Sequence, residues 1–218
     1  MKVFFTSDQH FFHINIIRYC QRPFAPDPQG ALENVQDLVR RYREKVGPDD
    51  AVVFLGDVAL ANSAAKKQLH LVFNELPGRK FLIMGNHDEF SMNFYKSLGF
   101  LEITDHLRIG RHFLCHLPLY APEDPHPKAA RLLALFKECG CDTLWHGHIH
   151  TLPSPEGDGI IRSNVCVDYA PNQAAPVEID IPEIRKFFED YFQGRIGKEA
   201  FAPCDPDLAA ALNRSKKK

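Results

Sequence analysis

Potential metal ligands occur in this sequence directly after short apolar runs. The tripeptide Asp8-Gln9-His10 follows residues 3–7, and Gly56-Asp57 follows residues 51–55. A short apolar run that ends in glycine or in polar residues is typical of a buried strand that leads into a loop. Loops at the carboxyl ends of strands are where open α/β sheets bind their ligands. The pattern therefore predicts a binding site at one edge of a sheet.

The tetrapeptide Gly85-Asn86-His87-Asp88 is the densest of these groups. It follows another apolar run and supplies an amide oxygen, an imidazole and a carboxylate side by side. Alone it is also compatible with an ordinary polar turn, just as the Asp8 group is compatible with a capping aspartate and a chance histidine. His116 and the segment Gly147-His148-Ile149-His150 also follow apolar runs. The repetition of one arrangement along the chain favours a shared site over separate turns.

The composition limits the class of protein. The chain has 218 residues, of which 44% are hydrophobic and 25% charged, and its formal net charge is −2. These values are typical of one globular domain with a large core, and they do not favour binding along a nucleic-acid backbone. No apolar stretch approaches the roughly 20 residues of a membrane span, and the run before Asp8 is too short for a signal peptide. We therefore expect a cytoplasmic protein that does not enter membranes, with its six cysteines reduced.

Hydrophobic periodicity predicts the elements that position these groups. Strands and helices alternate in the first half of the chain, which is typical of parallel crossovers. Residues 107–109 and 112–115 predict a hairpin, and residues 160–168 and 177–181 predict a final antiparallel pair. We expect one domain over residues 1–194 and a weakly structured C-terminal tail over residues 195–218. The other predicted strands are 3–7, 51–55, 80–84 and 143–145, and the predicted helices are 11–20, 31–46, 63–76, 91–98, 128–139, 182–192 and 207–213.

The five polar groups resemble the motifs of the calcineurin-like metallophosphoesterase superfamily. Its members carry Asp-x-His, Gly-Asp, Gly-Asn-His-Asp/Glu, His and Gly-His-x-His in this order, and all five occur here without a substitution between residues 8 and 150. The stretch His13…Arg22-Pro23-Phe24 is similar to a small bacterial-type branch that lacks a cap insertion. The resemblance implies an α/β fold in which two mixed sheets pack face to face between outer helices, a four-layer α/β/β/α sandwich.

The resemblance also implies a centre of two divalent metal ions. Two aspartates, one asparagine and four histidines form a mixed set of oxygen and imidazole ligands, which suits Mn²⁺ first and Fe²⁺, Zn²⁺, Ni²⁺ or Mg²⁺ as alternatives. The implied reaction is the hydrolysis of a phosphate ester, with in-line attack by a metal-bridging hydroxide. The two implied ligand groups, bridged by Asp57, are Asp8, His10 and His150 for one ion and Asn86, His116 and His148 for the other.

Four residues beside the implied ligands are candidates for a role in catalysis or in substrate binding. The resemblance implies that His87 contacts the phosphoryl group or protonates the leaving oxygen, and that Asp88 orients its ring. The two residues alone are also compatible with a role in shaping the loop. His13 and Arg22 are candidate substrate-binding residues, because arginine pairs readily with phosphate. A packing histidine and an exposed arginine at a helix end are equally compatible with these positions.

Three functions follow from this sequence. A site without a cap favours a phosphodiesterase, whose substrate would be a phosphate ester, with nucleotide-derived esters as one candidate class. The alternative is a phosphomonoesterase that acts on nucleotides or phosphoproteins. The second alternative is a binding module that keeps the fold and has lost catalysis. The sequence does not specify an oligomeric state.

Overall fold

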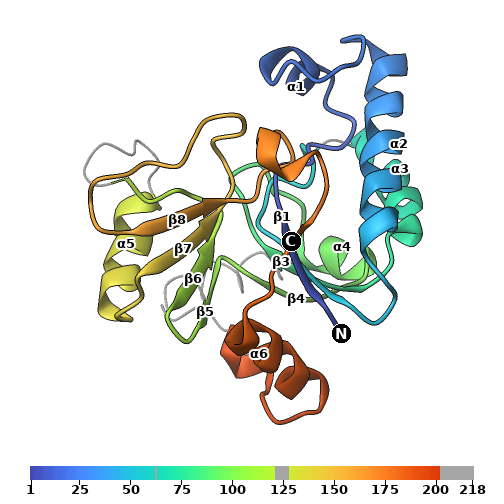
Figure 1. The fold of residues 1–218 in the computed structure, drawn as a ribbon. Coiled ribbons are helices and arrows are strands. Elements are labelled where there is room, and N and C mark those ends of the chain that lie inside the picture. The colour runs from blue at the N-terminus through green and yellow to red at the C-terminus, as the bar shows by residue number, and fades with distance from the viewer. Residues whose placement is uncertain (62, 121–127, 202–218) are drawn as a thin grey trace.

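The computed structural model describes residues 1–61, 63–120 and 128–201, and Figure 1 shows them as two β-sheets with helices on both sides. The strands are β1 (Val3–Thr6), β2 (Ala51–Phe54), β3 (Arg79–Ile83), β4 (Phe100–Thr104), β5 (His106–Ile109), β6 (His112–Cys115), β7 (Thr143–His146), β8 (Ile161–Asn164) and β9 (Val177–Glu178). The first sheet has the order β4-β3-β2-β1-β9 and the second β5-β6-β7-β8. Each sheet joins parallel strands to one antiparallel edge strand, β9 or β5. Both sheets are therefore mixed, as predicted.

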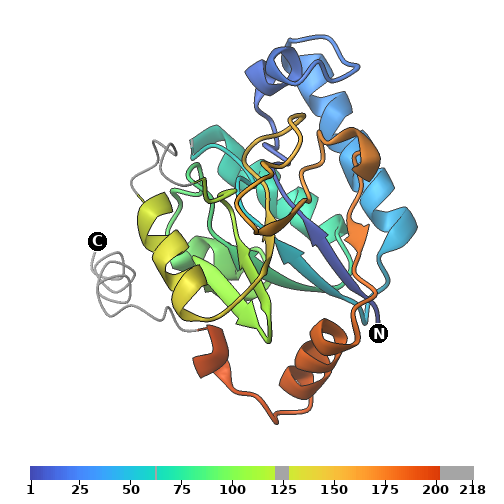
Figure 2. The ribbon, with the colours of Figure 1, turned by 60° about the vertical axis from the view of Figure 1, so that its left-hand side comes forward.

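Helices connect the parallel strands of the first sheet, and another connects β6 to β7; they cover the outer faces of the two sheets (Figure 2). The α-helices are α1 (Ile14–Tyr19), α2 (Pro28–Lys45), α3 (Ser63–Glu75), α4 (Met92–Ser97), α5 (Ala129–Glu138) and α6 (Pro182–Phe192), and the short 3-10 helices are η1 (Ala170–Asn172) and η2 (Lys198–Phe201). The parallel pairing of β1, β2 and β3, with α2 and α3 between them in the chain, confirms the predicted crossovers.

The layers follow from the two-residue period of the strands, whose side chains point alternately to opposite faces. Phe5 of β1 and Leu114 of β6 belong to the apolar core between the sheets. Phe4 belongs to the core beneath α2, α3 and α4, and Phe113 belongs to the core beneath α5. Three large apolar cores thus separate four layers, which confirms the predicted α/β/β/α sandwich.

The hairpin prediction is confirmed, whereas the predicted final antiparallel pair is wrong. β5 and β6 are antiparallel with Ile109 opposite His112. β8 instead pairs in parallel with β7, and β9 pairs with β1 in the other sheet. The chain between β8 and β9 crosses from one sheet to the other, and Cys166 forms a bridge to Ser7 on the way. An apolar run identifies a strand, but the path of the crossing segment decides its partner.

Several element boundaries differ from the predicted ones. The helix predicted from residue 11 begins at Ile14, because Phe12 has a left-handed backbone with φ 64°. β4 was not predicted. Packed structure extends past residue 194, because Phe201 of η2 is buried and its ring lies 5.3 Å from that of Phe81. The predicted helix over residues 207–213 lies outside the described residues.

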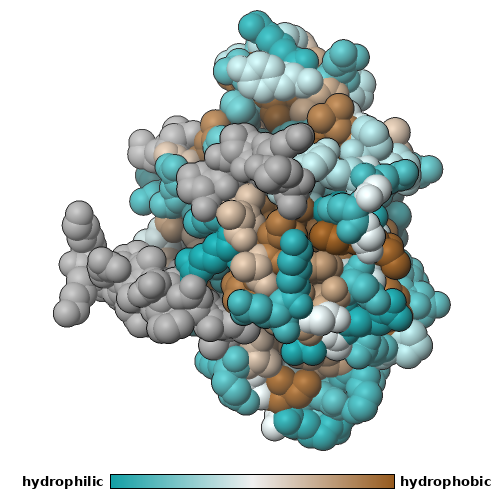
Figure 3. All heavy atoms as spheres, turned by 90° about the vertical axis from the view of Figure 1, so that its left-hand side faces the viewer, coloured by the Kyte–Doolittle hydropathy of each residue, from teal (hydrophilic) through white to brown (hydrophobic). Residues whose placement is uncertain are grey.

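The helices of the described ranges were compared with the requirements of a membrane-spanning helix. None of the helices there combines the length and the apolar composition that crossing a bilayer requires. Figure 3 shows the side of the molecule that carries the second sheet and α5, where hydrophobic residues lie among hydrophilic ones.

Candidate metal centre

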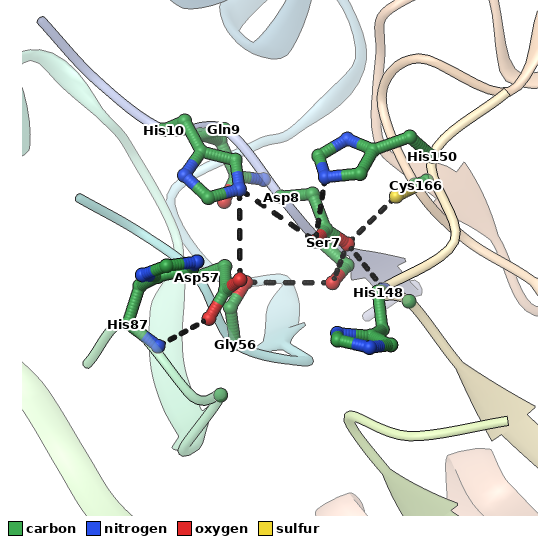
Figure 4. A network of polar contacts seen from close by, with 12 residues as sticks. Ser7, Asp8, Gln9, His10, Gly56, Asp57, His87, His148, His150 and Cys166 are labelled. Carbon is green, nitrogen blue, oxygen red and sulfur yellow. Dashed lines mark hydrogen bonds and ion pairs between the residues drawn. The ribbon is translucent and has the colours of Figure 1, made fainter. Parts of the chain in front are cut away.

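The seven predicted ligands lie in one cluster at the carboxyl ends of five strands. β1 leads to Asp8 and His10, β2 to Asp57 and β3 to Asn86, while β6 and β7 of the second sheet lead to the remaining histidines. Figure 4 shows five of the seven, which gather from the loops after β1, β2 and β7: Asp8, His10, Asp57, His148 and His150. Neighbouring ligand atoms in the cluster are 3.0–3.9 Å apart. The members of the cluster are Asp8, His10, Asp57, Asn86, His116, His148 and His150.

The first ligand group contains buried polar atoms that lack partners. Oδ1 of Asp8 and both ring nitrogens of His10 have no hydrogen-bond partner among the described residues. Nε2 of His10 lies 3.9 Å from Oδ1 of Asp8, and Nε2 of His150 lies 3.8 Å from the same oxygen. Burial lowers the pKa of His10 to about 4 in spite of the nearby carboxylates, so its ring is neutral at pH 7. Orphaned acceptors that converge in this way fit a divalent cation.

The other carboxylate oxygen of Asp8 is fully engaged. Oδ2 accepts hydrogen bonds from the Ser7 hydroxyl (2.5 Å), the Cys166 thiol (2.7 Å) and the backbone N–H of His148 (3.0 Å). Burial and the Asp8 carboxylate raise the pKa of the Cys166 thiol, which therefore acts as a donor. A cysteine at the site was not predicted from the sequence. The three hydrogen bonds to Oδ2 turn the other oxygen of Asp8, Oδ1, toward His10 and His150.

The second ligand group surrounds His116. Nδ1 of His116 lies 2.7 Å from the carbonyl oxygen of Leu55, which can only accept, so Nδ1 carries a proton. Nε2 faces Oδ1 of Asn86 at 3.0 Å, Nδ1 of His148 at 3.2 Å and Oδ2 of Asp57 at 3.4 Å. Burial alone would lower the pKa of His116, but carboxylates including that of Asp57 raise it to about 9. The three atoms that converge on Nε2 of His116 favour a positive charge between them, either a proton or a metal ion.

Asp57 lies between the two groups. Its Oδ2 atom is 3.5 Å from Nε2 of His10 and 3.4 Å from Nε2 of His116. Its Oδ1 atom accepts a hydrogen bond of 2.9 Å from the backbone N–H of His87. Burial alone would raise the pKa of Asp57, but His116 and His10 hold it well below its usual range. The carboxylate is therefore ionised and open to both ligand groups.

The backbone of the site is strained. Asp8, His10, Asp57, His148 and His150 all have positive φ, between 46° and 71°. Residues other than glycine rarely adopt this conformation, and it is common at functional sites. Each strand therefore turns sharply as it ends, which brings ligands from separate loops to one point.

Two glycines of the motifs allow the loops to approach one another. A Cβ atom on Gly85 would lie 2.2 Å from Oδ1 of Asp57, and one on Gly147 would lie 2.3 Å from Oδ2 of Asp8. Both distances are far shorter than any real contact, so only glycine fits between these carboxylates and the neighbouring strand ends.

Asp88 lies in a different place from the one expected. Its carboxylate accepts hydrogen bonds from the backbone N–H groups of Asp57 and Gly85, each at 2.8 Å, and from the Tyr95 hydroxyl at 3.2 Å. The expected bond to the ring of His87 is not among the contacts of the described chain. Burial and the Asp57 carboxylate raise the pKa of Asp88 to about 6. Asp88 thus joins the loops that follow β2 and β3, because buried backbone N–H groups there need an acceptor.

Arg22 also differs from its expected position, whereas His87 and His13 flank the site. Arg22 is buried and donates to Asp168, so it is not an exposed phosphate contact; a buried guanidinium needs such a carboxylate partner. The ring of His87 is exposed, 5.4 Å from the ring of His10. The half-buried ring of His13 lies 5.7 Å from that of His10. Both histidines border the first ligand group.

Asp168 is a further residue of the site that was not predicted, and its carboxylate lies 2.8 Å from Nδ1 of His150. The signal that identified Asp8 and Asp57 was present here too, because Asp168 directly follows the apolar run 165–167. The run lies in the segment that crosses between the sheets and not in the predicted antiparallel pair, so its end meets the ends of the other strands.

Comparisons with known proteins agree with this architecture. An uncharacterized protein of Methanocaldococcus jannaschii is 40% identical over 93 residues, a match that covers 43% of this chain and 50% of that protein. The Gene 66 protein of Mycobacterium phage L5 is 29% identical over 169 residues, which are 67% of this chain and 76% of the phage protein. The crystal structure of a protein of unknown function from Aquifex aeolicus has the same fold, with a TM-score of 0.61 and 24% identity over 87% of this chain and 99% of that one.

A family profile described as calcineurin-like phosphoesterase matches residues 1–115. The matched segment contains the motifs from Asp8 to Asp88 and makes up more than half of the 218 residues. With the motifs present and the ligand cluster assembled, we conclude that the chain belongs to the calcineurin-like phosphoesterase family.

Proposed function

We propose that this protein is a phosphodiesterase that depends on two divalent metal ions. Family membership supports a metal-dependent hydrolase of phosphate esters. The main support for two ions is the position of Asp57. Its Oδ2 atom is 3.5 Å from Nε2 of His10 and 3.4 Å from Nε2 of His116. Bound ions of this kind lower the pKa of a water molecule and neutralise charge on phosphoryl oxygens. The proposed ligands, with Asp57 shared, are Asp8, His10 and His150 for one ion and Asn86, His116 and His148 for the other.

The side chains around the ligands would act on the ester itself. His87 is exposed beside His10, where its ring can donate a proton to the leaving oxygen. Its backbone N–H is bonded to Asp57, which holds the backbone of His87 next to the shared carboxylate. His13, on another side of His10, is placed to contact a group carried by the ester. The mixed oxygen and imidazole ligands favour Mn²⁺ as the bound ion.

The exposure of the site supports a diester as the substrate. Across residues 1–61, 63–120 and 128–201, the loops leave His87 exposed and His148 half-exposed. A phosphodiester carries an organic group on each side of phosphorus, and an exposed site leaves room for both. A groove of about 630 Å³ elsewhere, between α2 and α3, contains none of the predicted site residues.

The test is metal-dependent hydrolysis of two model esters. Chelator-stripped protein is reloaded with Mn²⁺, Ni²⁺, Zn²⁺ or Mg²⁺ and assayed with bis(p-nitrophenyl) phosphate and with p-nitrophenyl phosphate. We expect turnover of the diester to return with the metal. Turnover of the monoester alone would identify a phosphomonoesterase. Two bound ions without turnover of either ester would identify a binding module.

Asp57→Asn tests the shared carboxylate. The substitution keeps the shape of the side chain and removes its charge, so we expect loss of diester hydrolysis and of one bound ion. The matched control is Asp158→Asn, because Asp158 is an exposed partner of Arg162 away from the cluster. Full activity in Asp57→Asn would contradict the dinuclear assignment.

A further inference from the structure

Two buried charged residues connect the separate parts of the first ligand group. Nε and Nη2 of Arg22 donate to the two carboxylate oxygens of Asp168 at 2.7 and 2.9 Å. Oδ2 of Asp168 lies 2.8 Å from Nδ1 of His150. The side chains of Arg22 and Asp168 are only 6% and 4% exposed. The pair is therefore part of the interior, directly behind a proposed ligand.

We propose that Asp168, held by Arg22, is a positioning residue that fixes the ring of His150 for cation binding; the inference rests on the metal centre proposed above. Because Arg22 donates to both of its oxygens, Asp168 is a charged acceptor. Nδ1 of His150 must then carry the ring proton, which leaves the lone pair on Nε2. Nε2 lies 3.8 Å from Oδ1 of Asp8, the carboxylate oxygen that has no partner in the described part of the chain.

The same guanidinium holds the loop that carries the other ligands of this group. Nη2 of Arg22 donates to the carbonyl oxygen of Asp8 and Nη1 to that of Gln9, each at 2.9 Å. This loop contains the positive φ angles of Asp8 (62°) and His10 (46°). One arginine thus ties the strained loop after β1 to the carboxylate that orients His150 after β7. The relative position of ligands far apart in the sequence depends on this ion pair.

A separate cation site at the same place is the competing explanation. Ligand atoms of Cys20, His150 and Asp168 lie within 4.8 Å of one another. Both oxygens of Asp168 are already bonded to Arg22, however, and a cation there would face the guanidinium charge. The geometry therefore favours support of His150 over a third ion.

The experiment compares Asp168→Asn with Asp158→Asn in the full chain. Asp158 is bonded to Arg162 through two nitrogens and lies outside the ligand cluster, which makes it a matched control. Chelator-stripped proteins are titrated with Mn²⁺ by calorimetry. We expect two ions in the unmodified protein and in Asp158→Asn, and a ~10–100-fold weaker affinity for one of the two in Asp168→Asn. Asp168→Glu, which keeps the charge, should recover part of that affinity.

NMR of the unmodified protein, labelled with ¹⁵N-histidine and loaded with Zn²⁺, reports the tautomer of His150 without any variant. We expect the proton on Nδ1. A proton on Nε2, or unchanged affinity for both ions in folded Asp168→Asn, would overturn the inference and leave the proposed function in place. Loss of a third ion in Asp168→Asn would make Asp168 a ligand and also overturn it. No cation binding by the unmodified protein would overturn the proposed function and this inference together.

Discussion

At the scale of the residue, four of the proposed ligands share one arrangement: one polar atom is held by the protein and another is presented to the site. Oδ2 of Asp8 is bonded while Oδ1 is free of partners within the described chain, and Oδ1 of Asp57 is bonded while Oδ2 faces two histidines. Nδ1 of His116 and Nδ1 of His150 are likewise held by Leu55 and Asp168. Such contacts orient a ligand before a metal arrives and set its basicity.

His87 is the residue whose loss should separate catalysis from metal binding. Its ring makes no bond to the ligands, whereas its backbone N–H is bonded to Asp57 and survives substitution. We expect His87→Ala to slow diester turnover by ~10²–10⁴-fold while two ions stay bound. Turnover against metal content, both measured on reloaded protein, checks this. Loss of the ions in His87→Ala would show that the ring supports the centre and does not act on the ester.

The raised pKa values of His116 and His150 predict how the stability of the metal-free protein depends on pH. Burial lowers their pKa, but Asp57 raises that of His116 to about 9 and Asp168 raises that of His150 to about 10, from 6.5. Their contribution to stability is thus complete below about pH 6.5 and is lost as pH rises through about 9 to 10. We expect the Tm of chelator-stripped protein to fall over that range. Mn²⁺-loaded protein, in which metal replaces the protons, should show a smaller fall; equal falls would contradict the assignment.

At the scale of the element, the sharp turn after each strand is what assembles the centre. Strands of both sheets end at the same edge, and Asp88 and Gly85 keep the turns after β2 and β3 in contact. The positions of the ligands therefore depend on close backbone approach as much as on the ligands themselves.

Gly85→Ala should disrupt metal binding for steric reasons alone. The new Cβ atom would lie 2.2 Å from Oδ1 of Asp57, so the shared carboxylate must move. We expect at least one ion to be lost, as measured by Mn²⁺ titration of folded protein. Gly140→Ala is the control: it has positive φ but open space around it, and should cost about 1 kcal/mol of unfolding free energy with both ions retained. Two bound ions in Gly85→Ala would contradict this explanation.

At the scale of the whole molecule, residues beyond the predicted domain end contribute to the core between the sheets. Phe201 is 4% exposed, and its ring lies parallel to that of Phe81 and close to those of Phe187 and Tyr191. Figure 1 shows α6 below the sheets, on the side away from α1. The segment from α6 to η2 therefore lies at the end of the sandwich opposite the loops of the proposed ligands.

Phe201→Ala should destabilise the protein by about 3–5 kcal/mol, because it opens a cavity in a packed aromatic cluster. Chemical denaturation of the metal-free protein measures this. Leu152→Ala is the matched control, since Leu152 is 61% exposed and should change stability by about 0.5 kcal/mol or less. If both variants were equally stable, the domain would end near residue 194, as the sequence predicted.

The residues alone predicted alternating strands and helices and the polar groups that follow the apolar runs, whereas the four layers and the roles of the ligands came from the family resemblance. In the folded chain, the two-residue period of Phe4 and Phe5 turns one side chain to the helices and the next to the other sheet. The polar groups could be found because each directly follows an apolar run, which is a local pattern.

The partners of these elements and of the charged side chains follow from the folded chain and not from the local sequence. β8 and β9 separate into different sheets, Asp88 holds backbone N–H groups, and Arg22 pairs with Asp168. Each of these contacts joins segments that are far apart in the chain. A local pattern shows that a strand or a charge must be satisfied, but the partner depends on which distant segment the fold brings within bonding distance.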